Sequence, residues 1–213
     1  FSSTSENALI KKGLVKLFNE NIESNKFYEN ANEILKETPP KPNLEQQNAI
    51  LTISNCHSFN TFLLNGITGS GKTEVYLRVI ENVLKEGKAV LILVPEIALT
   101  PQTFDRFYRR FNVPVSSMHS ALSDRERLDA YIDMATSKSG ILIGTRTALF
   151  TPIPNLGLIV IDEEHDSSFK QNDSFRYHAR NLAIMRAKLN NCPIVLGSAT
   201  PSLETIYNVQ KGV

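Results

Sequence analysis

The chain has 213 residues, of which 41% are hydrophobic and 21% are charged, so it can bury a core and is not disordered by composition. Its 23 Lys and Arg against 22 Asp and Glu leave a net charge of +1, so any binding to nucleic acid or membrane needs a local patch. Two distant cysteines, Cys56 and Cys192, argue against a disulfide framework and favour a reducing cytosol. No apolar run approaches the length of a membrane span, and we expect no membrane partner.

The first 38 residues are polar and differ in this from the rest of the chain. We expect a short helix over Glu6–Lys12 and a strand over Leu14–Phe18, which together are too small to bury a core. Residues 1–38 are therefore interpreted as the remnant of a neighbouring domain and a linker. The run Pro39-Pro40-Lys41-Pro42 marks the boundary, and residues 39–213 form the main domain.

From Asn43 onward, apolar strands alternate with helical stretches. Several strands are continuously apolar, which is typical of parallel strands buried on both faces. The alternation predicts an α/β fold, a mostly parallel sheet with helices on both faces. The predicted strands are Thr61–Leu64, Ala89–Val94, Val115–Met118, Ile141–Ile143, Leu158–Ile161 and Ile194–Leu196. The predicted helices are Lys72–Glu86, Pro101–Phe111, Asp124–Ala135 and Ala179–Asn190.

A phosphate-binding turn follows the first of these strands. The run Gly66-Ile67-Thr68-Gly69-Ser70-Gly71-Lys72-Thr73 fits the pattern GxxxxGK[ST] at every fixed position and leads into a helix. Its glycines let backbone N–H groups turn toward phosphate oxygens, at a helix N-terminus of positive potential. Lys72 is expected to contact the β- and γ-phosphates of ATP, and Thr73 to bind Mg²⁺. A glycine-rich tight turn with an exposed lysine is the alternative.

The acidic run Asp162-Glu163-Glu164-His165 follows the strand Leu158–Ile161 directly. Ligands of α/β sheets bind at this end of the strands. We expect Asp162 to hold Mg²⁺ and Glu163 to orient and deprotonate the attacking water. A solvated acidic loop is the alternative. The acidic run and the phosphate-binding turn are expected to end neighbouring strands and to face one triphosphate.

The tetrapeptide Gly197-Ser198-Ala199-Thr200 follows the last strand in the same way. The hydroxyls of Ser198 and Thr200 could sense the γ-phosphate through Glu163 or His165 and relay that state outward. His165 is either part of this relay or a hydrogen-bonded structural histidine.

These three motifs, in this order, resemble the first motor lobe of the superfamily-two DEAH-type helicases. The segments Val94–Gln102, His119–Arg127, Gly144–Phe150 and Asp162–Arg180 further resemble the family of bacterial primosomal replication-restart DNA helicases. The resemblance implies a RecA-like P-loop NTPase lobe, preceded in residues 1–38 by the end of a winged-helix domain. It implies an ATP-dependent helicase that uses Mg²⁺, unwinds DNA 3′-to-5′ and restarts replication at stalled forks. Zinc is not expected within this fragment.

The resemblance also implies partners and a location. The expected partners are forked or single-stranded DNA, single-strand DNA-binding protein, other primosome proteins and a second helicase lobe in cis. The expected location is the bacterial cytoplasm, associated with the nucleoid. Because the second lobe completes the site in such motors, the isolated fragment is expected to hydrolyse ATP poorly.

Further site residues follow from the resemblance alone. Gln46 is the candidate to read adenine, with the adjacent Gln47 as the alternative. The residues expected to contact nucleic acid are Thr100, Thr145, Arg146, Phe169, Phe175, Arg176, Tyr177 and His178. Arg146 could instead be an internal ion-pair partner, and Phe169 and Tyr177 could pack on the sheet rather than stack on bases.

Two other functions fit the same residues. An RNA helicase or a double-strand translocase would keep the chemistry and change the substrate. A catalytically idle nucleotide-binding scaffold belongs to another class, and the intact Lys72, Thr73, Asp162 and Glu163 argue against it.

Overall fold

The computed structural model describes residues 10–11, 34–173 and 175–212. The helix expected over Glu6–Lys12 lies outside the described residues except for Ile10 and Lys11, which are helical. The strand expected over Leu14–Phe18 lies wholly outside them, and so does most of the expected winged-helix remnant.

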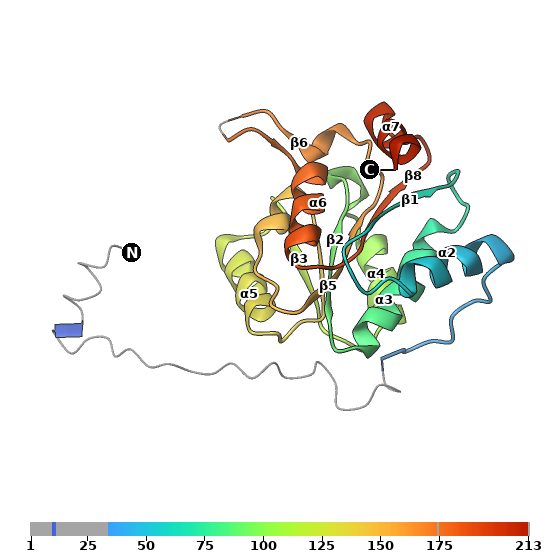
Figure 1. The fold of residues 1–213 in the computed structure, drawn as a ribbon. Coiled ribbons are helices and arrows are strands. Elements are labelled where there is room, and N and C mark those ends of the chain that lie inside the picture. Colours follow the sequence, from blue (N-terminus) through green and yellow to red (C-terminus); the bar gives the residue numbers. More distant parts are fainter. Residues whose placement is uncertain (1–9, 12–33, 174, 213) are drawn as a thin grey trace.

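The described part of the chain is built on a six-stranded sheet in the order β1-β8-β5-β2-β4-β3 (Figure 1), in which every pair of neighbours is parallel. The strands are β1 (Thr61–Asn65), β2 (Ala89–Leu93), β3 (Val115–Met118), β4 (Ile141–Gly144), β5 (Leu156–Ile161) and β8 (Ile194–Ser198). All six were expected from the sequence. The largest differences are that β5 begins two residues earlier than expected and β8 ends two residues later.

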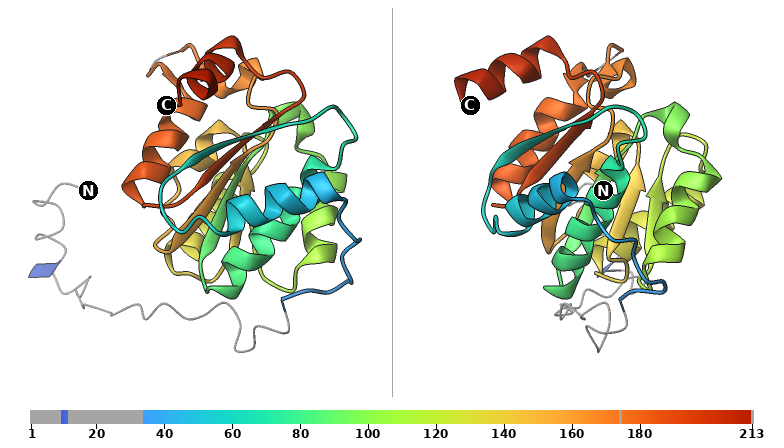
Figure 2. Two further views of the ribbon diagram at one scale, coloured as in Figure 1. Left: turned by 45° about the vertical axis from the view of Figure 1, so that its right-hand side comes forward. Right: turned by 90° about the vertical axis from the view of Figure 1, so that its right-hand side faces the viewer.

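Helices cover both faces of this sheet, which confirms the expected α/β class. The helices are α2 (Leu44–Ser54), α3 (Lys72–Lys85), α4 (Pro101–Arg110), α5 (Asp124–Ala135), α6 (Ala179–Leu189) and α7 (Leu203–Lys211). Helices α2, α3 and α4 contribute to the hydrophobic cluster on one face, and α5 and α6 contribute to the cluster on the other (Figure 2).

Strand β2 shows why the strands are continuously apolar. Its residues Val90 and Ile92 lie in one cluster, whereas Leu91 and Leu93 lie in the other, and all four are at most 2% exposed. Because successive side chains of a strand point to opposite faces, a sheet covered on both sides needs apolar residues at every position.

Short irregular elements follow the carboxyl ends of three strands. They are η2 (Glu96–Ala98) after β2, η3 (Arg146–Phe150) after β4, and η4 (Ser167–Phe169) after β5. After η4 comes a hairpin of β6 (Lys170–Gln171) and β7 (Tyr177–His178), which leads directly into α6. These segments, together with the turn after β1, lie at one edge of the sheet, where ligands of parallel α/β sheets bind.

Residues that precede the proline linker contact the lobe. Ile34 is fully buried in the cluster with α3, and Leu35 forms an isolated bridge with Phe111 after α4. Arg110, at the end of α4, is 3% exposed and pairs with Glu74 at 2.5 Å and with Glu37 at 3.4 Å. Across the described residues, no helix has both the length and the apolar character needed to cross a bilayer.

The packing predicts different reactivities for the two cysteines. Cys192 is 3% exposed, and burial raises its thiol pKa to about 11, whereas Cys56 is half-buried. Because the thiolate is the nucleophile, iodoacetamide at pH 8 should modify Cys56 in the native protein and leave Cys192 largely unmodified. The rate at Cys192 should rise about tenfold per pH unit below its pKa. Peptide mass spectrometry measures both sites, and rapid native labelling of Cys192 at pH 8 would contradict this packing.

Candidate functional site

The turn between β1 and α3 depends on its glycines. Gly69 and Gly71 have φ of 81° and 83°, in the left-handed region that favours glycine. Gly71 is also the N-cap residue of α3, and a Cβ placed on it would lie 2.4 Å from the side-chain Nε2 of Gln46. A residue with a side chain would therefore be strained at Gly69 and Gly71, and at Gly71 its Cβ would also displace the side chain of Gln46.

Lys72 begins α3 and folds back over the turn. Its Nζ donates a hydrogen bond to the carbonyl of Gly66 at 2.7 Å and lies 3.8 Å from Oε1 of Glu163. The side chain is only 9% exposed. A buried ammonium between a carbonyl and a carboxylate is held at the mouth of the turn, where it could exchange these partners for phosphate oxygens.

The acidic run begins where β5 ends. The Tyr76 hydroxyl, from α3, donates to Oδ1 of Asp162 at 3.1 Å. Burial raises the pKa of Asp162 above its usual value, the Tyr76 bond opposes this, and the charge of Glu163 adds to it. Burial likewise raises the pKa of Tyr76. A desolvated carboxylate of this kind gains stability when a cation binds to it.

The topology corrects one expectation. The phosphate-binding turn and the acidic run do not end neighbouring strands, because β8 lies between β1 and β5. Both nevertheless line one cavity of about 770 Å³, together with residues of α4. The residues of the two motifs on its wall are Thr68, Gly69, Gly71, Lys72, Thr73, Asp162 and Glu163. The strand between them carries the third motif, so all three motifs lie side by side at the carboxyl edge of the sheet.

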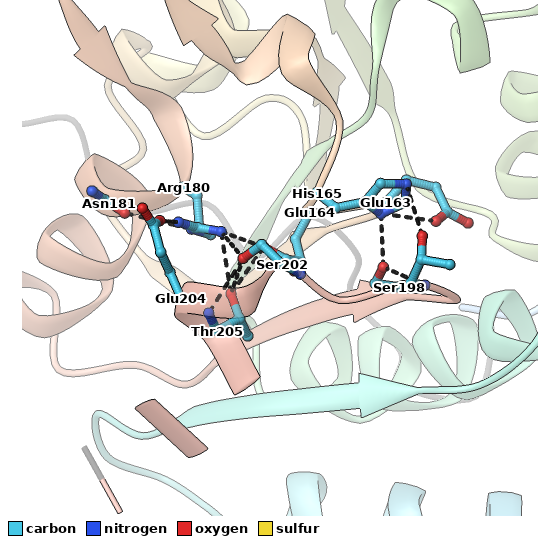
Figure 3. Close-up of polar contacts among 10 residues, drawn as sticks. Glu163, Glu164, His165, Arg180, Asn181, Ser198, Ser202, Glu204 and Thr205 are labelled. Atoms are coloured by element: carbon cyan, nitrogen blue, oxygen red, sulfur yellow. Dashed lines mark hydrogen bonds and ion pairs between the residues drawn. The ribbon is translucent and has the colours of Figure 1, made fainter. Parts of the chain in front are cut away.

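His165 connects the acidic run to the third motif (Figure 3). Its Nδ1 lies 2.7 Å from the Ser198 hydroxyl and 3.6 Å from the Glu163 carboxylate. Its Nε2 lies 3.2 Å from the Thr200 hydroxyl. The structure thus brings together the residues expected to relay the state of a γ-phosphate, and their roles remain predictions.

Gln46 lies against the phosphate-binding turn rather than free in solvent. It is the third residue of α2, where its Oε1 accepts from the Asn43 N–H at 3.0 Å in a capping box. Its Nε2 donates to the carbonyl of Ser70 at 3.0 Å. Gln47, the alternative, is exposed on the same helix. The geometry favours Gln46 as the residue near a bound nucleotide, and adenine contact would have to replace at least one of these bonds.

Two of the predicted nucleic-acid contacts lie inside the protein. Phe169 is 1% exposed in a core cluster, so it packs on the sheet, as in the alternative given for this residue. Thr145 is 3% exposed, whereas Thr100 is exposed and caps α4 by accepting from the Thr103 N–H. Arg146 is half-buried and donates to the Ser168 carbonyl at 2.8 Å, an internal hydrogen bond, and it forms no ion pair with another of the described residues.

Two other predicted contacts, Phe175 and Tyr177, form an aromatic patch with Phe150, which was not predicted; we define the aromatic patch as these three residues. The Tyr177 ring lies 5.3 Å from that of Phe150, edge to face, and 5.9 Å from that of Phe175. Phe150 is 56% and Phe175 72% exposed, and the adjacent Arg176 is exposed as well. His178 is half-buried, its Nδ1 has no hydrogen-bond partner among the residues that the structure describes, and burial lowers its pKa. Exposed rings beside a cation are typical of surfaces that bind single strands.

Sequence reasoning missed four residues of this region. Phe150 follows the same signal as Phe175, an aromatic residue in an exposed stretch, and could have been found. Tyr76, Glu164 and Arg180 carry no such signal, because their roles depend on contacts between distant segments. Burial tends to raise the pKa of Glu164, but bonds from Arg180, Ser202 and Thr205 outweigh it, and the pKa lies below its usual value.

The contact between Tyr76 and the third motif gives a testable prediction. A Cβ on Gly197 would lie 1.5 Å from the Tyr76 hydroxyl oxygen, so Gly197→Ala should lower the free energy of unfolding by about 3 kcal/mol, the upper end of what overpacking typically costs. The control is Gly87→Ala, where φ is 73° but no atom lies within 4 Å. It should cost only about 1 kcal/mol for backbone strain. Denaturant unfolding measures both, and equal losses would contradict the predicted clash.

Comparisons with solved structures support the fold described above. The chain is similar to RecG in its complex with a three-way DNA junction, with a TM-score of 0.61 and 24% identity over 82% of this chain and 23% of that one. It is similar also to the Hef helicase domain of Pyrococcus furiosus, with a TM-score of 0.60 and 23% identity over 84% of this chain and 37% of that one.

Comparisons with known sequences give the family. The chain is 60% identical over 154 residues to the replication restart protein PriA of Haemophilus influenzae, covering 72% of this chain and 21% of that protein. It is 45% identical over 216 residues to PriA of Bacillus subtilis, covering 100% of this chain and 26% of that protein. The chain thus spans about a quarter of the length of these relatives. The family model for DEAD/DEAH box helicases matches residues 43–209, and the chain therefore belongs to the DEAD/DEAH box helicase family.

Proposed function

We propose that this chain is the ATP-binding motor lobe of a DNA helicase. One observation carries the proposal: the turn after β1 and the acids after β5 line the same cavity, with Nζ of Lys72 3.8 Å from Oε1 of Glu163. A phosphate-binding turn facing a pair of acids suits the transfer of a phosphoryl group from a nucleoside triphosphate to water.

The residues at the cavity fit ATP with Mg²⁺. Asp162 is a carboxylate whose burial disfavours its charged form, so a cation beside it would offset that cost. The Thr73 hydroxyl and Asp162 would hold the ion, and Lys72 would exchange the Gly66 carbonyl for phosphate oxygens. Bound Mg²⁺ would neutralise charge that develops on the phosphates.

Glu163 is the proposed general base. Its carboxylate would orient a water molecule and take its proton as the water oxygen bonds to the γ-phosphorus. The bond from that phosphorus to the bridging oxygen breaks, which gives ADP and inorganic phosphate. His165 lies between the carboxylate and Ser198, so it can position Glu163 and report a change there to the third motif.

The aromatic patch is the proposed contact for single-stranded DNA. Its rings offer faces for bases, and Arg176 offers a cation for the phosphate backbone without reading sequence. The patch and Arg176 lie on segments that follow β4 and β5, so they share the edge of the sheet with the nucleotide cavity. This arrangement supports a lobe that couples strand binding to ATP hydrolysis.

The wider role is proposed from similarity. The relatives named above are replication restart proteins, which supports a role in restarting replication at stalled forks. We further propose 3′-to-5′ movement, a second helicase lobe in cis, and contacts with single-strand DNA-binding protein and other primosome proteins. The proposed location is the bacterial cytoplasm, in association with the nucleoid.

The chemistry is tested in the protein that joins this lobe to its second lobe. Lys72→Ala and Glu163→Gln should each lower kcat for DNA-stimulated ATP hydrolysis by about 100-fold or more, since each removes a group that acts on the phosphates or on the water. The control, Lys138→Ala, removes an exposed lysine outside the cavity and should leave kcat unchanged. Phosphate release with and without forked DNA measures the effect.

The same assay separates the alternatives. Stronger stimulation by RNA than by forked DNA would favour an RNA helicase, and stimulation by duplex without unwinding would favour a double-strand translocase. If the parent protein showed no hydrolysis and Lys72→Ala restored replication restart as well as the parent did, the chain would be a nucleotide-binding scaffold.

The aromatic patch is tested by binding. Phe150→Ala and Phe175→Ala should each raise the Kd for single-stranded DNA about 5- to 100-fold, because a base stacked on a ring contributes roughly 1–3 kcal/mol. The control, Leu189→Ala, removes an 83% exposed apolar side chain at the end of α6 and should leave the Kd unchanged. Fluorescence anisotropy gives the values, and equal Kd for all variants would exclude the patch from the binding surface.

A further inference from the structure

Glu164, the last acid of the acidic run, is not among the residues that line the nucleotide cavity. Figure 3 shows it turned toward Arg180 and Ser202, while Glu163 and His165 lie together with Ser198. Its carboxylate is 0% exposed and accepts from Arg180 at 2.6 Å, from the Ser202 N–H at 2.7 Å and from the Thr205 hydroxyl at 3.0 Å. Its own N–H donates to the Gly197 carbonyl at 2.9 Å. Both its side chain and its backbone are therefore anchored.

Arg180 supplies the charge that makes this burial possible. It lies in the first turn of α6 and is only 4% exposed. Besides Glu164, its guanidinium donates to the Ser202 hydroxyl at 2.5 Å, to the Thr205 hydroxyl at 3.2 Å and to the exposed Glu204. A planar guanidinium with several donors can satisfy all of these groups at once, which a lysine cannot.

The Glu164–Arg180 ion pair joins the two ends of a loop. This loop, residues 165–179, follows Glu164, contains η4 and the hairpin of β6 and β7, and ends before Arg180 in α6. This loop carries two members of the aromatic patch, Phe175 and Tyr177. A buried ion pair thus joins the beginning of the loop to its end, and Ser202 and Thr205 extend the contact to α7, just after the third motif.

The residue before Glu164 is strained. Glu163 has φ of 49°, a left-handed conformation that is unfavourable for a residue with a side chain. Such a conformation persists only where the surrounding structure fixes it. The neighbouring residue, Glu164, is fixed by three partner residues of its side chain and by one backbone bond. It therefore anchors one side of the peptide that carries Glu163, whose own carbonyl accepts from the Asp166 N–H at 2.9 Å.

We propose that Glu164 and Arg180 are a positioning pair, which holds Glu163 in its strained conformation and couples movement of the loop 165–179 to it. The inference rests on the proposed function, because it assigns Glu163 the role of base and the loop that of a DNA contact. Neither residue of the pair lines the nucleotide cavity or belongs to the aromatic patch. Binding of a strand to the hairpin would shift the start of α6, and the pair would pass that shift to Glu163.

The experiment uses the protein that joins both motor lobes, with the variants Glu164→Gln and Arg180→Lys. Each keeps the size of the side chain and weakens the pair. We expect kcat for ATP hydrolysis with saturating single-stranded DNA to fall about tenfold or more, because a small displacement of a catalytic group costs a large factor in rate. The KM for ATP and the Kd for DNA should stay within about threefold of the parent, since no binding contact is removed. A stopped-flow phosphate assay and fluorescence anisotropy give these values.

Two further variants separate positioning from stability. Glu204→Gln breaks the exposed contact of the same arginine, on a side chain that is 77% exposed, and should leave kcat unchanged. The double variant Glu164→Met with Arg180→Met removes both charges, so its thermal midpoint should recover relative to Glu164→Met alone. A merely structural pair predicts that kcat recovers along with the midpoint, whereas a positioning pair predicts that kcat stays low.

The outcomes distinguish this inference from the proposed function. If the parent protein hydrolyses ATP with DNA stimulation and the folded variants keep kcat within about twofold, the positioning pair is overturned and the motor remains. Recovery of kcat in the double variant overturns it as well. If the parent protein itself shows no DNA-stimulated hydrolysis, the proposed function fails and the inference fails with it.

Discussion

The parallel sheet buried on both faces is the constraint from which the site follows. Most of its strands have apolar residues at successive positions, so most polar side chains gather at or beyond the strand ends, and parallel strands share one carboxyl edge. The phosphate-binding turn follows β1, the acidic run follows β5, and the third motif begins at the end of β8, which lies between those two strands. The hydrogen-bond ladder between β1 and β8 continues into the phosphate-binding turn, where the Gly66 N–H donates to the Ser198 carbonyl at 3.1 Å.

Buried polar side chains near this edge of the sheet occur in hydrogen-bonded or ion-paired sets. Tyr76 donates to Asp162, Arg180 to Glu164, and Arg110 to Glu74. A buried charge or hydroxyl without such a partner would be costly, so each set fixes the relative position of two segments that are distant in sequence. The nucleotide cavity and the acidic run are thus held by contacts between the segments that surround them.

The sequence predicted most of the architecture because the relevant signals are local. Continuous apolar runs identify the strands, and GxxxxGK[ST] identifies the turn, since its geometry depends only on consecutive residues. Helices α2 and α7 were not predicted. Their first turns depend on capping by Asn43 and by Ser202. Helix α2 shows no clear apolar face, and the apolar side chains Leu203 and Tyr207 of α7 are exposed.

The direction of side chains in loops is where prediction from the sequence failed. Phe169 and Phe175 lie in the same polar stretch, yet the first is 1% and the second 72% exposed. A loop residue has no periodicity that fixes its direction, so long-range packing decides it. The phosphate-binding turn and the acidic run could be identified from the sequence, because each consists of contiguous residues. The separation of the two by β8, the packing of Phe150 with Tyr177, and the neutralisation of Glu164 by Arg180 could not, because these contacts join segments that approach one another only when the sheet is formed.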